Sequence, residues 1–190
     1  MLTKKGEIVQ SKHPWVEKVL YDQSFIESKI KECAKWVNET YKDSKDLILV
    51  GLLKGSVPFL AQLIKDIDVD HVLDFMIASS YSGSHASSGS VKIIMDLDND
   101  IENKDVLIIE DIIDSGITLD KIKKMLLERH PKSLRILTLM DKPYNRKVDL
   151  KADKFGFEVE NAFLVGFGLD YQEKLRNLNY IGVMDKKFIK

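Results

Sequence analysis

The sequence has little of the residues that build cross-links and metal centres. One of its 190 residues is a cysteine, Cys33, so no disulfide can form within the chain. A single thiol fits a reducing compartment, and we expect the cytoplasm. The four histidines show no paired ligand spacing, and one cysteine cannot complete a zinc site. The sequence therefore excludes a disulfide framework and a structural zinc site.

Long apolar runs and an excess of one charge are also missing. No apolar run approaches membrane-spanning length, and residues 1–15 lack the apolar core of a signal peptide. Lys and Arg number 29 against 30 Asp and Glu, a net charge of −1, whereas a dedicated nucleic-acid binder usually carries a basic excess. We expect neither membrane nor nucleic acid as a partner. The length predicts one domain over residues 1–190.

Three common catalytic motifs are absent from the sequence. It contains no G-x-x-x-x-G-K-[ST] loop, and Gly166 and Gly168 lack the third glycine of a G-x-G-x-x-G motif. A G-x-S-x-G nucleophile elbow is missing as well. These absences exclude an ordinary P-loop nucleotide hydrolase and argue against a dinucleotide site and a Ser-His-Asp hydrolase.

The most informative stretch that is present covers residues 105–119. A β-branched apolar run, 106–109, predicts a strand buried on both faces, and Glu110 and Asp111 follow at its expected end. Asp-Ser-Gly-Ile-Thr at 114–118 then supplies a glycine, hydroxyls and the start of a helix, which together suit a phosphate. Carboxylates beside a phosphate cradle indicate a site for a phosphorylated sugar. Acids without histidines or thiols favour Mg²⁺ as the metal.

The rest of the chain alternates strand-like and helix-like segments. A Ser-x-x-Glu capping box at Ser24 and Glu27 predicts a helix that runs to about Tyr41. Further strands are expected at 47–53, 72–78, 91–97, 134–140, 155–159, 163–167 and 180–184, helices from about 58 and 118, and a short amphipathic segment at 175–178. Serial βα units predict an α/β fold with a mainly parallel sheet flanked by helices.

Three candidate segments follow the predicted strands directly. Lys54, residues 110–118 and Lys142 each stand at the carboxyl end of a strand, which is the edge where open α/β sheets bind ligands. Residues 79–90 are rich in serine and glycine, and we interpret them as a long loop that covers the site as a lid.

The segment VLIIEDIIDSGITL at 106–119 resembles the signature of the type I phosphoribosyltransferases. GLLKGSVPFLAQL at 51–63, SSYSGS at 79–84, DKP at 141–143 and FLVGFGLDYQEKLRNL at 163–178 resemble the hypoxanthine-guanine branch in the same order. The resemblance implies the fold of that family, with a core of about 22–150 and a small hood subdomain from about 1–21 and 151–190. It also implies transfer of ribose 5-phosphate from phosphoribosyl pyrophosphate to hypoxanthine or guanine, with IMP or GMP and pyrophosphate as products.

The resemblance also assigns roles to the central segment. Glu110 and Asp111 would hold the ribose hydroxyls and the Mg²⁺ bound there, although strict strand geometry points neighbouring side chains to opposite faces. Asp114 would be the general base at N7 of the purine. The 5′-phosphate would lie against Asp114, Ser115, Gly116, Ile117 and Thr118. Ser115 stands where threonine is frequent in the family, and Ile117 stands where some members carry lysine.

Further roles carried by the resemblance concern pyrophosphate and the base. Lys54, Gly55 and Arg176 would bind pyrophosphate, with a cis peptide expected at Leu53–Lys54. Lys142 would donate to the purine O6, and because lysine is only a donor, adenine with its amino group should be rejected. The remaining assignments are Ser80 and Tyr81 as the lid, Phe163 stacked on the base, Leu164 contacting it through its main chain, and Asp170 assisting a second Mg²⁺.

Two alternatives stay open. A phosphoribosyltransferase for xanthine would share these residues, whereas Lys142, Phe163 and Asp170 argue against adenine and pyrimidines. A regulator that senses phosphoribosyl pyrophosphate could use the same fold, but the near-neutral charge and the set of Asp114, Lys54 and Arg176 favour an enzyme. The family resemblance also leads us to expect a homodimer or homotetramer.

Overall fold

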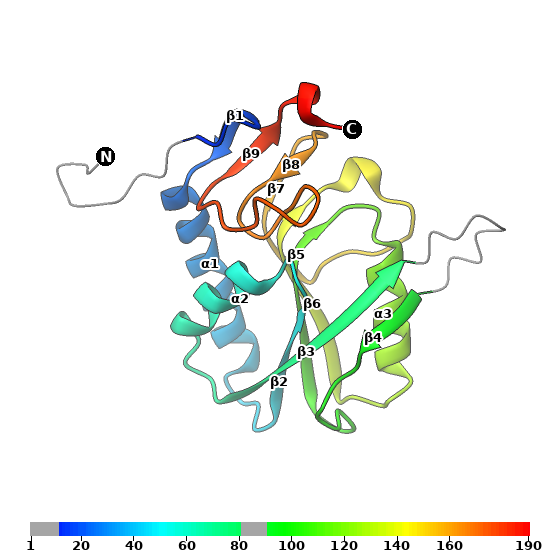
Figure 1. Cartoon of the computed structure of the whole chain (residues 1–190). Helices are drawn as coiled ribbons and strands as arrows, with labels where there is room; N and C mark the ends of the chain where they lie inside the picture. Colours follow the sequence, from blue (N-terminus) through cyan, green and yellow to red (C-terminus); the bar gives the residue numbers. More distant parts are fainter. Residues whose placement is uncertain (1–11, 81–90) are drawn as a thin grey trace.

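The structure, a computed structural model, describes residues 12–80 and 91–190. Within these residues it contains a six-stranded sheet in the order β4-β3-β2-β5-β6-β7, with helices on both faces (Figure 1). The strands of this sheet are β2 (Leu47–Leu52), β3 (His71–Ser80), β4 (Val91–Met95), β5 (Asp105–Ile113), β6 (Ser133–Asp141) and β7 (Lys154–Glu158). All neighbours pair in parallel except β3 and β4, which confirms the mainly parallel α/β sheet that the sequence predicts.

The helices cover the sheet because its central strands are apolar on both sides. The helices are α1 (Gln23–Tyr41), α2 (Val57–Leu63) and α3 (Ile117–Leu127), joined by 3-10 turns η1 (Ile64–Asp66), η2 (Pro143–Asn145) and η3 (Lys186–Phe188). Leu49 and Leu107 pack in one core with α1 and α2, whereas their neighbours Ile48 and Val106 pack in a second core with α3. Alternate residues of one strand thus serve two cores.

A smaller antiparallel sheet joins the two ends of the chain. It consists of β1 (Val16–Tyr21), β9 (Ile181–Met184) and β8 (Leu164–Val165), and it has a core of its own around Val165, Leu178 and Tyr180. The sequence did not predict β1, because residues 16–21 alternate only weakly. Strand β7 belongs to the large sheet through its pairing with β6, so that sheet extends past residue 150.

Helix α1 begins differently from the prediction. Its N-cap is Asp22, whose Oδ1 accepts a hydrogen bond of 2.8 Å from the Phe25 N–H. Ser24 lies inside the helix, and its hydroxyl donates to the same carboxylate oxygen at 2.8 Å. The predicted capping box at Ser24 and Glu27 is therefore wrong, because a carboxylate two residues earlier already accepts the free N–H group. The predicted end at Tyr41 is confirmed.

Strand β5 is longer than the sequence suggested. It pairs with β2 only as far as Ile109, but with β6 it continues to Ile113. Glu110 and Asp111 therefore lie within the strand and not after its end, on the stretch where its β2 side is open. Along this part of β5, where no β2 residue pairs with it, both carboxyl groups border the same cavity.

The described residues contain no helix both long and apolar enough to cross a membrane. The predicted lid covers residues 79–90, but Ser79 and Ser80 are the last residues of β3. The rest of it, with Tyr81, falls in residues 81–90, outside the described part of the chain. The amphipathic segment expected at 175–178 forms turns, with Leu175 at a φ of 76°.

Candidate active site

The three predicted segments meet at one edge of the large sheet. Because β2, β5 and β6 run in parallel, their carboxyl ends point the same way. Lys54, residues 114–118 and Lys142 follow there, and Glu110 and Asp111 lie in the last part of β5. A cavity of about 120 Å³ opens at this edge, and its lining includes Gly55, Glu110, Asp111, Thr118 and Arg176. The structure thus brings together residues that are more than 120 positions apart in the sequence.

Glu110 and Asp111 both line this cavity, although they are neighbours in a strand. Burial raises the pKa of Asp111 to about 6, a shift that the Ile112 N–H and the Arg176 guanidinium oppose and the Asp170 carboxylate reinforces. Burial, together with the nearby Asp111 carboxylate, raises the pKa of Glu110 well above its ordinary value. Two poorly compensated carboxyl groups in one cavity form a site that a cation would stabilise.

Gly55 is required by the position of Asp111. A Cβ atom added at Gly55 would lie 1.9 Å from Asp111 Oδ2, which leaves no room for any side chain. The peptide bond just before, Leu53–Lys54, is cis, as the family resemblance implied. Gly168, at a φ of 97°, approaches from the other side, where an added Cβ would lie 2.1 Å from the Gly55 carbonyl oxygen.

The segment after β5 forms the expected cradle at the start of α3. Gly116 is the N-cap residue with a φ of 77°, and helix α3 begins at the next residue. The first N–H groups of α3 lie beyond this glycine, and they form the positive end of the helix dipole. This arrangement of a left-handed glycine and a helix N-terminus can bind a phosphate.

Arg146 holds this segment in place, and the sequence analysis missed it. Its Nε donates to the Asp114 carbonyl oxygen at 3.1 Å, and one terminal nitrogen donates to the Ile113 carbonyl oxygen at 3.2 Å. The guanidinium also donates to the Leu150 carbonyl oxygen and to the Asp141 carboxylate. The only signal in the sequence is the position of this arginine, shortly after the carboxyl end of β6.

Lys142 and Phe163 lie together on one side of Asp114. Lys142 is buried, and its Nζ donates to the Ala162 carbonyl oxygen at 3.0 Å and lies 3.7 Å from Asp114 Oδ2. Phe163 is 45 % exposed, and its ring meets that of Tyr171 edge to face at 5.8 Å. Leu164 is buried and starts β8. A half-exposed ring beside a buried ammonium can receive a flat polar base.

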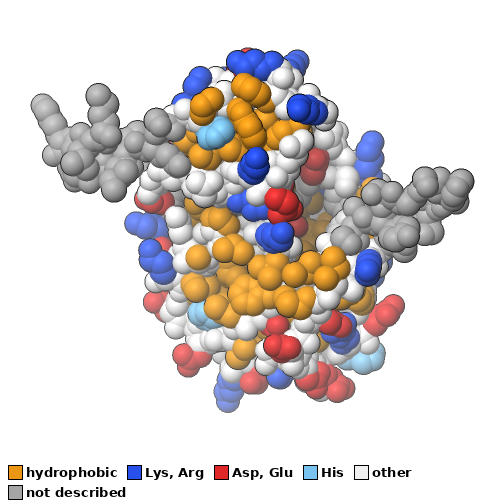
Figure 2. Space-filling view, in the orientation of Figure 1, with side chains coloured by type: hydrophobic (Ala, Val, Ile, Leu, Met, Phe, Trp, Pro, Cys, Tyr) orange, Lys and Arg blue, Asp and Glu red, His pale blue; other side chains and the backbone are white. Residues whose placement is uncertain are grey.

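A network of four charged groups joins Lys54, Asp170, Glu173 and Arg176. Arg176 lies 2.8 Å from Asp170 Oδ1 and 3.3 Å from Glu173 Oε1, and it donates to the Gly168 carbonyl oxygen at 2.8 Å. Lys54 Nζ lies 2.8 Å from Glu173 Oε2. Glu173 is a second residue that the sequence analysis missed. Figure 2 shows acidic and basic side chains meeting between the small sheet and the hydrophobic band below it.

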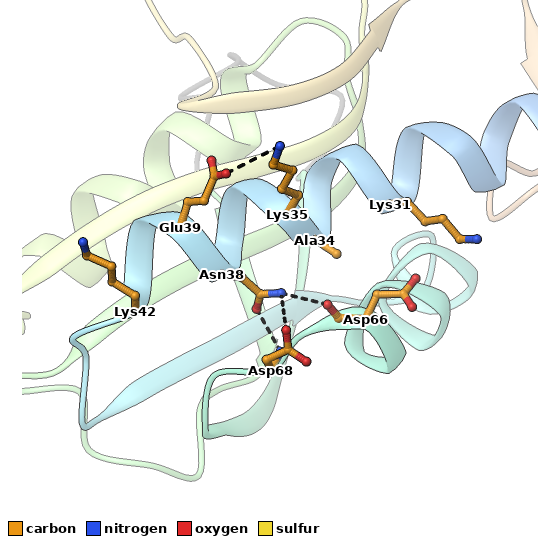
Figure 3. A pocket seen from close by; sticks show the side chains of 8 residues that line it. All are labelled: Lys31, Ala34, Lys35, Asn38, Glu39, Lys42, Asp66 and Asp68. Carbon is orange, nitrogen blue, oxygen red and sulfur yellow. Dashed lines mark hydrogen bonds and ion pairs between the residues drawn. The ribbon is translucent and has the colours of Figure 1, made fainter.

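A larger hollow lies elsewhere, between α1 and η1 (Figure 3). It measures about 490 Å³, and several of its polar groups already pair with one another. Asn38 donates to the Asp66 carbonyl oxygen at 3.0 Å and to the Asp68 carboxylate at 3.2 Å, while Lys35 pairs with Glu39. No predicted site residue lines it, so the candidate site remains at the sheet edge.

Comparison with known proteins finds relatives over most of the chain. The family model described as "Phosphoribosyl transferase domain" matches residues 18–172. The chain is 53 % identical over 169 residues to a hypoxanthine-guanine phosphoribosyltransferase of Bacillus subtilis, covering 89 % of this chain and 93 % of that protein. It is 48 % identical over 165 residues to a hypoxanthine phosphoribosyltransferase of Escherichia coli, covering 86 % and 93 %. A crystal structure of a hypoxanthine phosphoribosyltransferase from Staphylococcus aureus superposes with a TM-score of 0.90 at 43 % identity, covering 97 % of this chain and 100 % of that one.

Proposed function

The chain belongs to the phosphoribosyl transferase family, and we propose that it transfers ribose 5-phosphate from phosphoribosyl pyrophosphate to hypoxanthine or guanine. The products are IMP or GMP and pyrophosphate, and the reaction salvages free purine bases. The observation that carries the proposal is the likeness to hypoxanthine-guanine phosphoribosyltransferases over nine-tenths of the chain. The buried free thiol of Cys33 fits a reducing cytoplasm, where we place the reaction.

The substrate's ribose 5-phosphate occupies the centre of the proposed site. Its 5′-phosphate lies against residues 114–118, where the α3 N-terminus and Gly116 provide N–H groups. Glu110 and Asp111 bind the ribose hydroxyls in the cavity that they share. Arg146 acts through the backbone, because it fixes the carbonyl groups that set the course of this segment.

Mg²⁺ fits the donor set of this cavity. Glu110 and Asp111 are hard oxygen ligands whose burial disfavours the charged forms, and Asp170 is close enough for its charge to raise the pKa of Asp111. No group of three or more possible ligands converges among the described residues, which suits a metal that takes its other ligands from substrate oxygens. A bound Mg²⁺ would neutralise charge on the departing diphosphate.

The proposed chemistry needs one cation cluster and one base. The bond between C1 of the ribose and pyrophosphate breaks first, and Lys54 and Arg176 stabilise the charge on the leaving group. Asp114 accepts the proton from N7 of the purine as N9 attacks C1. Its carboxylate is half exposed and 3.7 Å from Lys142 Nζ, so it can reach a base that Lys142 holds.

Lys142 sets the preference among bases in this proposal. Its Nζ is buried, and it can only donate hydrogen bonds. Hypoxanthine and guanine offer it the O6 acceptor, while Phe163 stacks on the ring and the main chain of Leu164 contacts its edge. Adenine would leave the buried ammonium facing an amino group, which should weaken the binding of adenine by a few kcal/mol.

An assay with four bases tests this function. Purified protein is supplied with phosphoribosyl pyrophosphate, Mg²⁺ and, in turn, hypoxanthine, guanine, xanthine and adenine, and nucleotide formation is measured. We expect product from hypoxanthine and guanine and none from adenine. Product from adenine alone would overturn the base assignment, and no product from any base would favour a regulator.

We also propose that the protein is a homo-oligomer, either a dimer or a tetramer. A band of hydrophobic side chains crosses one face over α2 and β3 (Figure 2). Val57 of α2, Leu73 of β3 and Ile94 of β4 are each more than a third exposed, which is costly for a lone chain. Sedimentation velocity should give the mass of two or four chains, and a monomer at micromolar concentration would contradict the proposal.

A further inference from the structure

Glu173 is held in an unusual turn at the edge of the site. Tyr171 and Lys174 exchange two main-chain hydrogen bonds of 3.1 Å, which leaves Gln172 and Glu173 as the two residues of a tight turn. Their φ angles are 52° and 63°, a left-handed conformation that such turns usually assign to glycine or asparagine. A strained backbone at a long charged residue suggests that its side chain serves a purpose there.

The Glu173 carboxylate bridges two cations. Its Oε2 lies 2.8 Å from Lys54 Nζ and its Oε1 lies 3.3 Å from an Arg176 nitrogen. The main-chain N–H of Glu173 donates to Asp170 Oδ2 at 2.9 Å, which ties the turn to the other partner of Arg176. Lys54 and Arg176 are the two side chains that the proposed function assigns to pyrophosphate.

We propose that Glu173 is an internal counter-anion that occupies the pyrophosphate-binding cations when the site is empty. A carboxylate presents two oxygens to Lys and Arg much as a phosphate does, so it can take the same partners. Pyrophosphate must displace it to bind, and it returns as pyrophosphate leaves. This inference rests on the proposed function, and it assigns Glu173 the role of weakening pyrophosphate binding and speeding release.

The exposure of the ion pair fits a displaceable contact. The side chains of Lys54 and Glu173 are 63 % and 64 % exposed, and exposed pairs are weak and easily opened. Binding to a form that is only partly populated lowers the apparent affinity by that fraction. Glu173 therefore lowers the affinity for pyrophosphate only modestly, which suits a product that has to leave in every cycle.

The turn itself does not depend on the Glu173 side chain. The ring of Tyr171 packs edge to face on Trp15 and Phe163, and its hydroxyl accepts a 2.7 Å hydrogen bond from the Lys190 N–H. Lys174 Nζ lies 5.5 Å from the centre of the Trp15 ring. Because these contacts remain without a carboxylate, Glu173→Gln should fold and keep the turn.

The test compares pyrophosphate binding in four full-length proteins, wild type and three variants, by calorimetry with Mg²⁺ present. Glu173→Gln should bind magnesium pyrophosphate about fivefold more tightly than wild type, because losing a weak, exposed ion pair frees both cations. Glu173→Asp, which keeps the charge, should stay nearer to wild type. Glu39→Gln removes a lysine-paired glutamate on α1, away from the site, and should change nothing.

Kinetics provide a second readout that a purely structural role would not give. In Glu173→Gln the inhibition constant for pyrophosphate should fall by the same factor, and kcat should fall while KM for the purine base stays unchanged. If wild type binds magnesium pyrophosphate but Glu173→Gln binds it equally or more weakly, the counter-anion role is wrong. If folded wild type binds no magnesium pyrophosphate, the proposed function itself fails.

Discussion

The two halves of the candidate site are built in opposite ways. At the sheet edge, regular strands and a helix start position the groups, and Asp111 and Lys142 are both 8 % exposed. In the segment 163–176, turns with positive φ at Phe167, Gln172 and Glu173 position the groups, and the side chains of Lys54 and Glu173 are more than half exposed. One half is packed and the other is charged and open.

This difference matches what each half would hold in the proposed reaction. The sheet edge binds ribose 5-phosphate, which remains bound from substrate to product. The turn segment, with Lys54, faces pyrophosphate, which must depart. Packing suits a group that stays in one position, and exposed ion pairs suit a group that is exchanged. Variants in each half can break or sharpen this comparison.

The largest effect is expected at Asp114, the proposed base of the packed half. Asp114→Asn removes the proton acceptor but keeps the size and the backbone, so kcat should fall by about 10²–10⁴-fold. Binding of IMP should change little. Asp120→Asn on α3, which loses only the ion pair with Lys124, is the matched control. Unchanged turnover in Asp114→Asn would remove its role as the base.

The next largest effect is expected at the contact between the halves. Gly55→Ala places a Cβ atom 1.9 Å from Asp111 Oδ2, so the carboxylate must move, and activity should fall by about 100-fold. Gly156→Ala on β7 is the control, because its Cβ would lie 2.7 Å from the Leu139 carbonyl oxygen. That variant should lower the free energy of unfolding and leave the activity of folded protein intact. Full activity in Gly55→Ala would show that Asp111 can shift without harm.

A smaller effect is expected at Arg146, which supports the packed half from behind. Arg146→Lys loses the planar fork that reaches Asp114, Ile113 and Leu150, so KM for phosphoribosyl pyrophosphate should rise about tenfold. The free energy of unfolding should fall by about 1–3 kcal/mol as buried acceptors lose their donor. Arg129→Lys, at a surface pair with Asp96, should change neither. A drop in stability with KM unchanged would limit Arg146 to a structural role.

The packed half could largely be predicted from the sequence. Short apolar runs predicted β2, β5 and β6, and the rule that ligands bind at strand ends placed residues 110–118 and Lys142 together, beside Lys54 of the open half. The end of β5 was predicted wrongly, because β6 pairs with it beyond Ile109 and local composition does not record a partner strand. Arg146 escaped notice because three of its acceptors are backbone carbonyl groups, which no residue type in the sequence marks.

The open half was visible only through the family resemblance. Residues 175–178 have a helix-like spacing, yet hydrogen bonds from Phe167 to Leu178 and from Gly168 to Arg176 fold this segment into turns. Positive φ at Gln172, Glu173 and Leu175 has no signature in those residue types. Glu173 gains its role partly through Lys54, which is 119 positions away. Tertiary contacts, and not local preference, determine this half.

The pH dependence of stability provides the finest comparison, because the two halves should respond with opposite sign. The folded pKa of Asp111 is raised from 3.8 to about 6, so its burial costs nothing below pH 4 and destabilises the metal-free protein increasingly up to pH 6. The pairing with Lys54 lowers the folded pKa of Glu173 below 4.5, so its contribution is present above pH 4.5 and is lost as the pH falls through the folded pKa. Urea unfolding at pH 3, 4, 5, 6 and 7 would measure both. Relative to wild type, Asp111→Asn should gain stability as the pH rises from 4 to 6, whereas Glu173→Gln should lose a little as the pH rises toward 4.5 and change no further above it. Parallel trends in the two variants would mean that the carboxyl groups of both halves share one electrostatic environment, and the contrast between a packed and an open half would not hold.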